Sequence, residues 1–212
     1  MKIDLLGQTF MLHPFKAMYW EEESILLIAD LHLGKSRHFR KEGFPVPQAV
    51  GDTNYDKLIS LFLDFKPARV VFLGDLFHSD YNKEWIEFED LIGRFPDIEF
   101  DLVKGNHDIL DVSLYAQSRM QIHYETLLIK PFALSHEPLD DIEENWFNLS
   151  GHIHPCVWLK GRGRQKLRLP CFYFNKYQGI LPAFGAFTGM AAIAIKKGDR
   201  VYGVTDDAVM AL

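Results

Sequence analysis

The chain has 212 residues, of which 48% are hydrophobic and 25% are charged, and its formal net charge is −6. This composition is typical of a soluble globular protein, and the length suits a single domain spanning residues 1–212. The negative charge excludes a chain-wide basic surface, so any nucleic acid would have to be bound by a local basic patch. No apolar run approaches the roughly 20 residues of a membrane span, and the start lacks a signal-peptide layout, so we expect a cytoplasmic protein without a membrane partner.

The chain contains two cysteines, Cys156 and Cys171. They do not form a CxxC pair, which argues against a zinc ribbon. We expect two buried free thiols, as in other proteins of the reducing cytoplasm, rather than a disulfide.

Three short apolar runs in the first half predict strands, at residues 24–30, 69–75 and 99–106. Continuous apolar runs of this length are typical of strands that are buried on both faces. Between them, apolar residues recur at three- and four-residue steps and predict two helices, at residues 55–65 and 85–92. The alternation of strand and helix predicts an α/β sheet.

The second half contains mostly short β-like runs separated by turns with Gly or Pro. These runs lie at residues 124–129, 132–135, 147–151, 156–160, 167–174, 190–195 and 201–204. We therefore expect a second sheet packed on the first.

Side chains that can bind metals stand at the ends of the predicted strands. The first three runs end in Asp30, Asp75 and Asn106, and later ones end near His136 and the His152-x-His154 pair. Since ligands bind beyond the carboxyl ends of strands in open α/β sheets, we expect these residues to converge. A single such Asp is usually a turn residue, and a single His usually makes an ordinary hydrogen bond, but their combination favours a metal site.

The ligand types indicate which metals would bind. Carboxylate, amide and imidazole groups together suit Mn, Fe or Zn better than Mg²⁺, which prefers oxygen ligands. Two cations roughly 3.5–4 Å apart can clamp a phosphate group for in-line attack. We expect two divalent metal ions, with manganese as the metal that supports activity in vitro and Fe or Zn as alternatives.

The arrangement resembles the signature of the calcineurin-like metallophosphoesterase superfamily. The matching motifs are Asp30-x-His32, Gly74-Asp75, Gly105-Asn106-His107-Asp108, His136 and Gly151-His152-x-His154. They occur in the family's order and extend across most of the chain. The resemblance implies an α/β fold in which a two-sheet β-sandwich is flanked by helices, in four layers (αββα).

The resemblance also implies a role for each residue. One metal would be bound by Asp30, His32 and His154, the other by Asn106, His136 and His152, and Asp75 would bridge both. His107 would contact the phosphate and protonate the leaving oxygen. Asp108 would orient that imidazole, although a role as a plain turn residue is nearly as well supported.

Residues 29–35 and 38–47 resemble a narrower family, the ligase-associated DNA damage response endonucleases. Those proteins are metal-dependent phosphodiesterases that cut DNA, encoded in bacteria near a DNA ligase, an exonuclease and a helicase. The resemblance implies DNA as the substrate and a functional association with those three enzymes in DNA repair.

Two basic segments could contact the DNA backbone. Lys35, Arg37, His38 and Arg40 directly follow the first metal motif, and we predict that they bind phosphate or substrate. A denser basic segment spans residues 160–168, but it lies outside the matched motifs, and protection of an edge strand explains its charges slightly better than DNA contact does.

The metal motif alone leaves other functions open, because substrate choice is made by loops. One alternative is a phosphatase or cyclic-nucleotide phosphodiesterase that acts on small substrates. A non-catalytic scaffold is another, but the complete ligand set and His107 argue against it.

Overall fold

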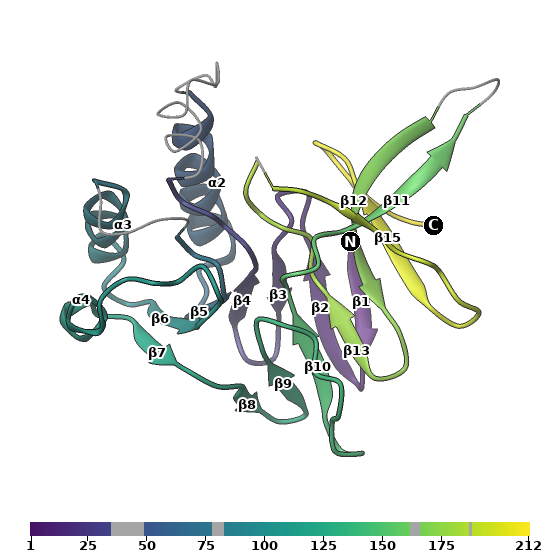
Figure 1. Ribbon diagram of the computed structural model, residues 1–212, viewed down its shortest axis with the longest axis horizontal. Helices are drawn as coiled ribbons and strands as arrows, with labels where there is room; N and C mark the ends of the chain where they lie inside the picture. Colours follow the sequence, from purple (N-terminus) through teal and green to yellow (C-terminus); the bar gives the residue numbers. More distant parts are fainter. Residues whose placement is uncertain (35–48, 78–82, 162–165, 187) are drawn as a thin grey trace.

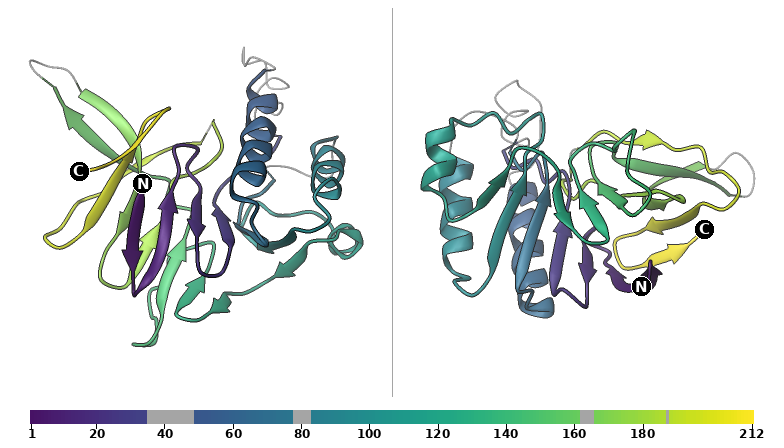
Figure 2. Two further views of the ribbon diagram at one scale, coloured as in Figure 1. Left: turned by 180° about the vertical axis from the view of Figure 1, so that it is seen from behind. Right: turned by 90° about the horizontal axis from the view of Figure 1, so that it is seen from below.

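The computed structural model describes residues 1–34, 49–77, 83–161, 166–186 and 188–212, without the side chains of residues 49–52, 83 and 160. Two β-sheets lie face to face, and helices cover the outer side of one of them (Figure 1). Figure 2 shows the same layers from behind and from below.

The first sheet has seven strands in chain order. These are β1 (Lys2–Leu5), β2 (Gln8–Leu12), β3 (Met18–Trp20), β4 (Ile25–Ile28), β5 (Arg69–Leu73), β6 (Glu99–Val103) and β7 (Gln121–His123). The pairs from β1 to β4 are antiparallel, and those from β4 to β7 are parallel. All four residues of β4 are buried, as expected for a parallel strand covered on both faces.

Three helices pack against the outer face of this sheet. They are α2 (Ala49–Phe65), α3 (Lys83–Gly93) and α4 (Val112–Gln117). The apolar faces that predicted α2 and α3 supply Leu58, Phe62 and Phe88 to the core beneath them. Helix α4, which was not predicted, is short and is capped by Asp111, whose side chain accepts a hydrogen bond from the Ser113 backbone N–H at 2.8 Å.

The second sheet contains the remaining strands. These are β8 (Leu127–Ile129), β9 (Phe132–Leu134), β10 (Phe147–Ser150), β11 (Pro155–Lys160), β12 (Lys166–Phe174), β13 (Gln178–Ile180), β14 (Ala191–Ala192), β15 (Arg200–Val204) and β16 (Val209–Ala211). In its centre, β9 and β10 are parallel, as are β10 and β13. Here too the central strand, β10, is buried along its whole length.

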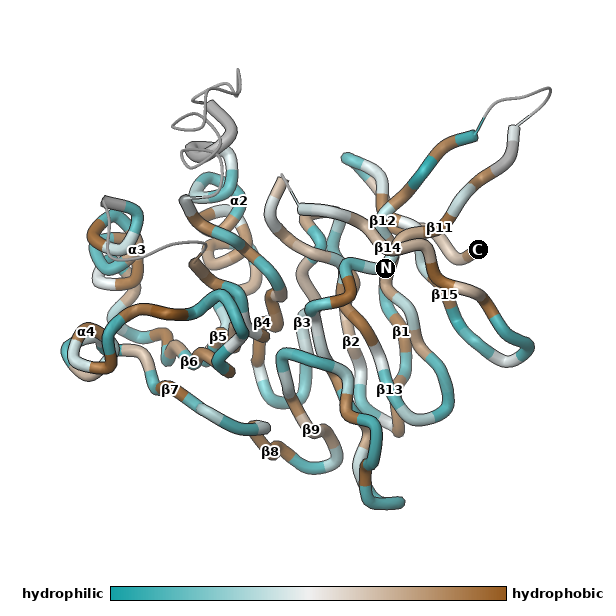
Figure 3. Tube along the Cα trace, in the orientation of Figure 1, coloured by the Kyte–Doolittle hydropathy of each residue, from teal (hydrophilic) through white to brown (hydrophobic). Residues whose placement is uncertain are grey.

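A second core joins the two sheets. Phe10 of β2 and Trp20 of β3 contact Phe132 of β9 with ring centroids 5.1 and 4.9 Å away in edge-to-face geometry. Hydrophobic residues concentrate in the strands, whereas several turns between strands are hydrophilic (Figure 3). The packing holds the ends of β4, β5, β9 and β10 in fixed relative positions.

The prediction of an α/β fold with a two-sheet β-sandwich flanked by helices is confirmed. Among the described residues, the helices all pack on the first sheet, and a small apolar cluster around Cys171 covers the outer face of the second. Cys156 and Cys171 are both buried and free, as predicted. Burial, assisted by the neighbouring Cys156, raises the pKa of Cys171 to about 12. In the described part of the chain, no helix has the length and hydrophobicity to cross a membrane.

Candidate metal centre

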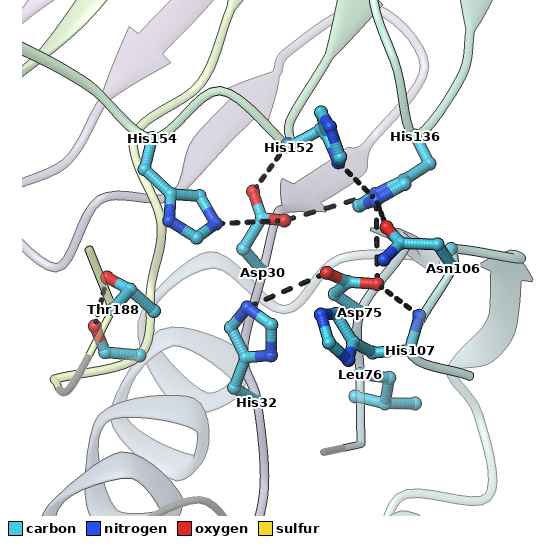
Figure 4. A network of polar contacts seen from close by, with 12 residues as sticks. Asp30, His32, Asp75, Leu76, Asn106, His107, His136, His152, His154 and Thr188 are labelled. Carbon is cyan, nitrogen blue, oxygen red and sulfur yellow. Dashed lines mark hydrogen bonds and ion pairs between the residues drawn. The ribbon is translucent and has the colours of Figure 1, made fainter. Parts of the chain in front are cut away.

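The predicted ligands converge where strand ends of the two sheets meet (Figure 4). From the first sheet, Asp30 and His32 follow β4, Asp75 follows β5 and Asn106 follows β6. From the second sheet, His136 follows β9, and His152 and His154 follow β10. This is the edge at which parallel strands present their carboxyl ends, where α/β proteins commonly bind ligands.

The side chains form two groups that could each hold a metal ion. Asp30, His32 and His154 form the first group, and their potential ligand atoms all lie within 4.8 Å of one another. Asp30 Oδ1 and His154 Nε2 are 3.3 Å apart, both are buried, and neither has a hydrogen-bond partner among the described residues. Buried polar atoms normally have such a partner, so this pair fits a cation bound between them.

The second group contains Asp75, His136 and His152. His136 Nε2 lies 3.0 Å from His152 Nδ1, 3.0 Å from Asn106 Oδ1 and 3.4 Å from Asp75 Oδ1. Nitrogen and oxygen atoms so close around one point suit a divalent cation with mixed ligands. Asn106, which the family resemblance assigned to the same metal as His136 and His152, therefore lies beside this group.

Asp75 lies between the groups. Its Oδ1 faces His136 of the second group, and its Oδ2 lies 3.7 Å from His32 Nε2 of the first. A carboxylate with one oxygen toward each group can bridge two cations, the role assigned to Asp75 from the sequence.

Two backbone carbonyls orient the imidazoles. His136 Nδ1 lies 3.0 Å from the Leu73 carbonyl, and His154 Nδ1 lies 3.0 Å from the Gly189 carbonyl. Since a carbonyl only accepts, each Nδ1 donates its N–H, and the Nε2 of a neutral imidazole would be left to bind a cation in the ligand groups. Sequence reasoning missed Leu73 and Gly189, because a backbone carbonyl has no signature in residue type.

Several of the predicted metal ligands have an unusual backbone conformation. Nine non-glycine residues in the described part of the chain have a positive φ, and five of them are predicted ligands. These five are Asp30, His32, Asp75, His152 and His154, with φ between 48° and 65°. Such conformations are uncommon for side chains with a Cβ and concentrate at functional sites.

Two glycines allow the close approach of these segments. A Cβ at Gly74, whose φ is +75°, would lie 2.1 Å from His136 Nδ1. A Cβ at Gly105 would lie 2.4 Å from both the backbone nitrogen and Oδ1 of Asp75. A larger residue at either position would therefore displace a predicted ligand.

Asp108 is fully buried below the centre. Its Oδ1 accepts hydrogen bonds from the backbone N–H groups of Leu76 and Phe77, at 2.9 and 3.2 Å, and its Oδ2 accepts one from Gly105 at 2.8 Å. Burial raises the pKa of Asp108 to about 6, although the N–H groups of Gly105 and Phe77 act in the opposite direction. These contacts join the loops after β5 and β6, whereas orientation of the His107 imidazole by Asp108 stays a prediction.

His107 has an exposed side chain at the rim of the site. Its backbone N–H donates to Asp75 Oδ1 at 2.9 Å, and its ring centroid lies 5.6 Å from that of His32. The ring is therefore exposed, while the His107 backbone is held by the Asp75 carboxylate.

The predicted phosphate contacts Lys35, Arg37, His38 and Arg40 lie outside the described residues. The same is true of the middle of the basic segment 160–168, whose described ends belong to β11 and β12. In β12, Arg168 donates to the Cys156 sulfur at 3.0 Å and stacks over Trp158, 5.7 Å from its ring.

Residues 23–177 match the calcineurin-like phosphoesterase family. The crystal structure of Pseudomonas putida nuclease MPE is 31% identical and has a TM-score of 0.84, covering 100% of this chain and 99% of its own. Yfce, a phosphoesterase from E. coli, is 13% identical over 87% of this chain and 90% of its own, with a TM-score of 0.43. No curated protein sequence matches significantly. Because the family match spans most of the chain and includes the ligand-bearing strand ends, the protein belongs to the calcineurin-like phosphoesterase family.

Proposed function

We propose that this protein hydrolyses phosphodiester bonds in DNA with the help of two divalent cations. The observation that carries this proposal is the pair of facing ligand groups, with one oxygen of Asp75 directed toward each. A pair of adjacent cations is suited to an in-line displacement at phosphorus.

Each residue of the candidate site has a proposed role. Asp30, His32 and His154 would hold one cation, Asn106, His136 and His152 the other, and Asp75 both. Bound cations supply Lewis acidity toward phosphate oxygens and make water a stronger nucleophile at neutral pH. The exposed His107 imidazole, at the rim beside His32, would donate a proton to the leaving oxygen.

DNA as substrate is supported by the full-length similarity to a protein described as a nuclease. Manganese is the metal that we propose for activity in vitro, with iron or zinc as alternatives, since imidazole forms a large part of the ligand set. The resemblance of residues 29–35 and 38–47 to DNA damage response endonucleases further supports a role in DNA repair together with a ligase, an exonuclease and a helicase.

The test is a hydrolysis panel with purified metal-loaded protein. Single-stranded DNA, duplex DNA, a chromogenic phosphodiester and a chromogenic phosphomonoester are each incubated with Mn²⁺, Zn²⁺, Fe²⁺ or Mg²⁺. We expect cleavage of DNA and of the diester, strongest with Mn²⁺ and abolished in Asp75→Ala. Turnover of the monoester alone, or activity that persists in Asp75→Ala, would overturn the proposal.

A further inference from the structure

The chain between β13 and β14 runs along the first ligand group. Its described residues 183–186, 188 and 189 are here called the β13–β14 linker. The Phe184 backbone N–H donates to the Ala29 carbonyl at 2.9 Å, and the Gly185 N–H donates to the Asp30 carbonyl at 3.1 Å. The linker is therefore hydrogen-bonded to the loop that carries Asp30, although it contains no predicted ligand itself.

The other end of the β13–β14 linker holds a second ligand of the same group. The Gly189 carbonyl lies 3.0 Å from His154 Nδ1, and the Ala191 N–H, just after the linker, donates to the His154 carbonyl at 3.0 Å. Figure 4 shows Thr188 of the linker on the side of the centre where His154 lies. One short stretch of backbone thus contacts the loop of Asp30 as well as the imidazole of His154.

The linker and the loop after β4 approach each other as closely as two backbones can. A Cβ at Gly185 would lie 2.6 Å from the Leu31 carbonyl oxygen and 3.2 Å from that of Asp30. Both neighbours are backbone atoms, which cannot rotate out of the way as a side chain can. A glycine is therefore needed at this position if the linker is to stay in place.

The ammonium group of Lys16 fixes the start of the linker. It donates to the carbonyls of Ala183 at 2.8 Å and Phe184 at 3.3 Å, across a separation of 167 residues for the first contact. Burial, followed by repulsion from Lys57, lowers the pKa of Lys16 to about 8, so the charged lysine lowers the stability of the fold at neutral pH. Natural proteins commonly keep such a cost where function requires it.

We propose that Lys16 is a positioning residue for the cation of the first ligand group. By holding the β13–β14 linker against the loop after β4, its ammonium keeps Asp30 and His154 at the separation that a shared cation requires. Asp30 Oδ1 and His154 Nε2 are 3.3 Å apart, and neither has a hydrogen-bond partner among the described residues. This inference rests on the two-cation centre of the proposed function, and it adds a residue that is neither a ligand nor a neighbour of one in the sequence.

The second ligand group is held by different contacts. His136, for example, is oriented by the Leu73 carbonyl, which belongs to β5 and not to the linker. Loss of the Lys16 ammonium should therefore weaken the first cation much more than the second. A residue that only stabilised the fold would not discriminate between them.

The test measures the affinity of each site for Mn²⁺ by isothermal titration. His152→Ala removes a ligand of the second group and leaves the first complete, whereas His154→Ala does the reverse. Lys16→Met, which has nearly the same side-chain length but no ammonium, is made in both backgrounds. Lys197→Met, at an exposed lysine in the turn before β15, is the matched control.

We expect Lys16→Met to raise the Kd of the first cation about tenfold, as loss of a group that orients a metal ligand usually does, and to change the Kd of the second much less. Lys16→Arg should keep most of the affinity for the first cation. Its guanidinium also donates to carbonyls, and the cavity of about 160 Å³ that Lys16 lines leaves room for it. Lys197→Met should bind both cations as the wild type does.

Gly185→Ala displaces the linker while leaving Lys16 in the chain. Because the added Cβ meets the Leu31 carbonyl, the linker must move away from the loop after β4. We expect the Kd of the first cation to rise by about tenfold or more, again with little change at the second. Gly93→Ala, with nothing within 4 Å of the added Cβ, is the control.

The outcomes separate this inference from the proposed function. If the wild type binds two Mn²⁺ ions but cleaves no phosphodiester, the proposed function fails, whereas the positioning role is still decided by the Kd values. If the wild type is active but Lys16→Met changes the two Kd values equally, or changes neither, only the positioning role is overturned. Should Lys16→Met fail to fold, Gly185→Ala decides, and an unchanged first Kd in that variant overturns the inference.

Discussion

His107 lies next to the candidate metal ligands but belongs to neither ligand group. Its backbone N–H contacts Asp75, but its exposed ring is not part of either ligand group. The Asp75 carboxylate thus fixes the backbone of His107, while the imidazole is exposed. Binding of metal and transfer of a proton should therefore be affected by different substitutions.

His107→Ala should lower turnover of a phosphodiester by about 100- to 10,000-fold, the usual contribution of a general acid. The metal content should stay at the wild-type value because the ring is in neither ligand group. Elemental analysis and steady-state kinetics on the same preparation check this. A loss of metal in His107→Ala would place the imidazole among the ligands.

Titration of Lys16 should make the free energy of unfolding change with pH in the alkaline range. Its pKa is lowered from 10.5 to about 8 in the folded protein, so between these values the unfolded chain binds a proton that the folded chain has released. The free energy of unfolding should therefore rise with pH through this window, and the cost of the buried charge is fully present below pH 8.

Denaturant unfolding at pH 7.5 and 9.5 measures this effect. We expect the wild type to gain about 1–2 kcal/mol relative to Lys16→Met between the two pH values. The comparison cancels contributions from other groups that titrate in the same range. Equal gains in the two proteins would show that folding does not lower the pKa of Lys16.

At the scale of elements, the loops that follow β5 and β6 interlock beneath the metal centre. Asp108 from the second loop accepts N–H groups of Leu76 and Phe77 from the first, and the Gly105 α-carbon lies against Asp75. The position of the Asp75 carboxylate thus depends on a neighbouring loop as much as on its own strand.

Gly105→Ala tests this dependence. Its Cβ would lie 2.4 Å from the Asp75 backbone, so the loop must shift and the Asp75 carboxylate must move with it. We expect at least one metal to bind about tenfold more weakly and stability to fall by about 1–3 kcal/mol. Gly93→Ala, at the end of α3 with nothing within 4 Å of the added Cβ, is the control. Isothermal titration with Mn²⁺ and thermal unfolding measure both quantities, and wild-type affinity in Gly105→Ala would contradict the expectation.

At the scale of the whole molecule, the centre joins the two sheets. Asp30, Asp75 and Asn106 come from the first sheet, and the three histidines after β9 and β10 come from the second. The His152 backbone N–H also donates to Asp30 Oδ2 at 2.9 Å across a separation of 122 residues. Cations bound here would hold the sheets together in the folded state only.

Removal of metal should therefore lower the melting temperature. For a metal present at about 100 times its Kd, the stabilisation is roughly 2.7 kcal/mol, or about 5–10 °C for a chain of this size. Differential scanning calorimetry with and without a chelator checks this for the wild type and for Asp75→Ala, which should respond much less. A wild-type melting temperature that does not change with chelator would mean that the centre binds metal too weakly to stabilise the fold.

Much of the fold could be predicted from the sequence because its local signals agree with the tertiary structure. The continuous apolar runs ending at Asp30 and Asp75 predicted buried parallel strands, and the spacing of Leu58 and Phe62 predicted α2. The β1–β2 hairpin was not predicted. Its turn places Leu6 and Gly7 at positive φ, whereas Asn-Gly or Asp-Gly is the usual sequence for such turns.

By itself, the sequence determined the residue types of the site and their places at strand ends, since both follow from local patterns. The family resemblance supplied the division of the ligands into two groups, and only the tertiary structure decided the distances between them and which way Asp75 faces. The reason is physical. Those distances depend on how two sheets and a helix pack, and packing is set by contacts between residues far apart in the chain, such as Phe10 with Phe132.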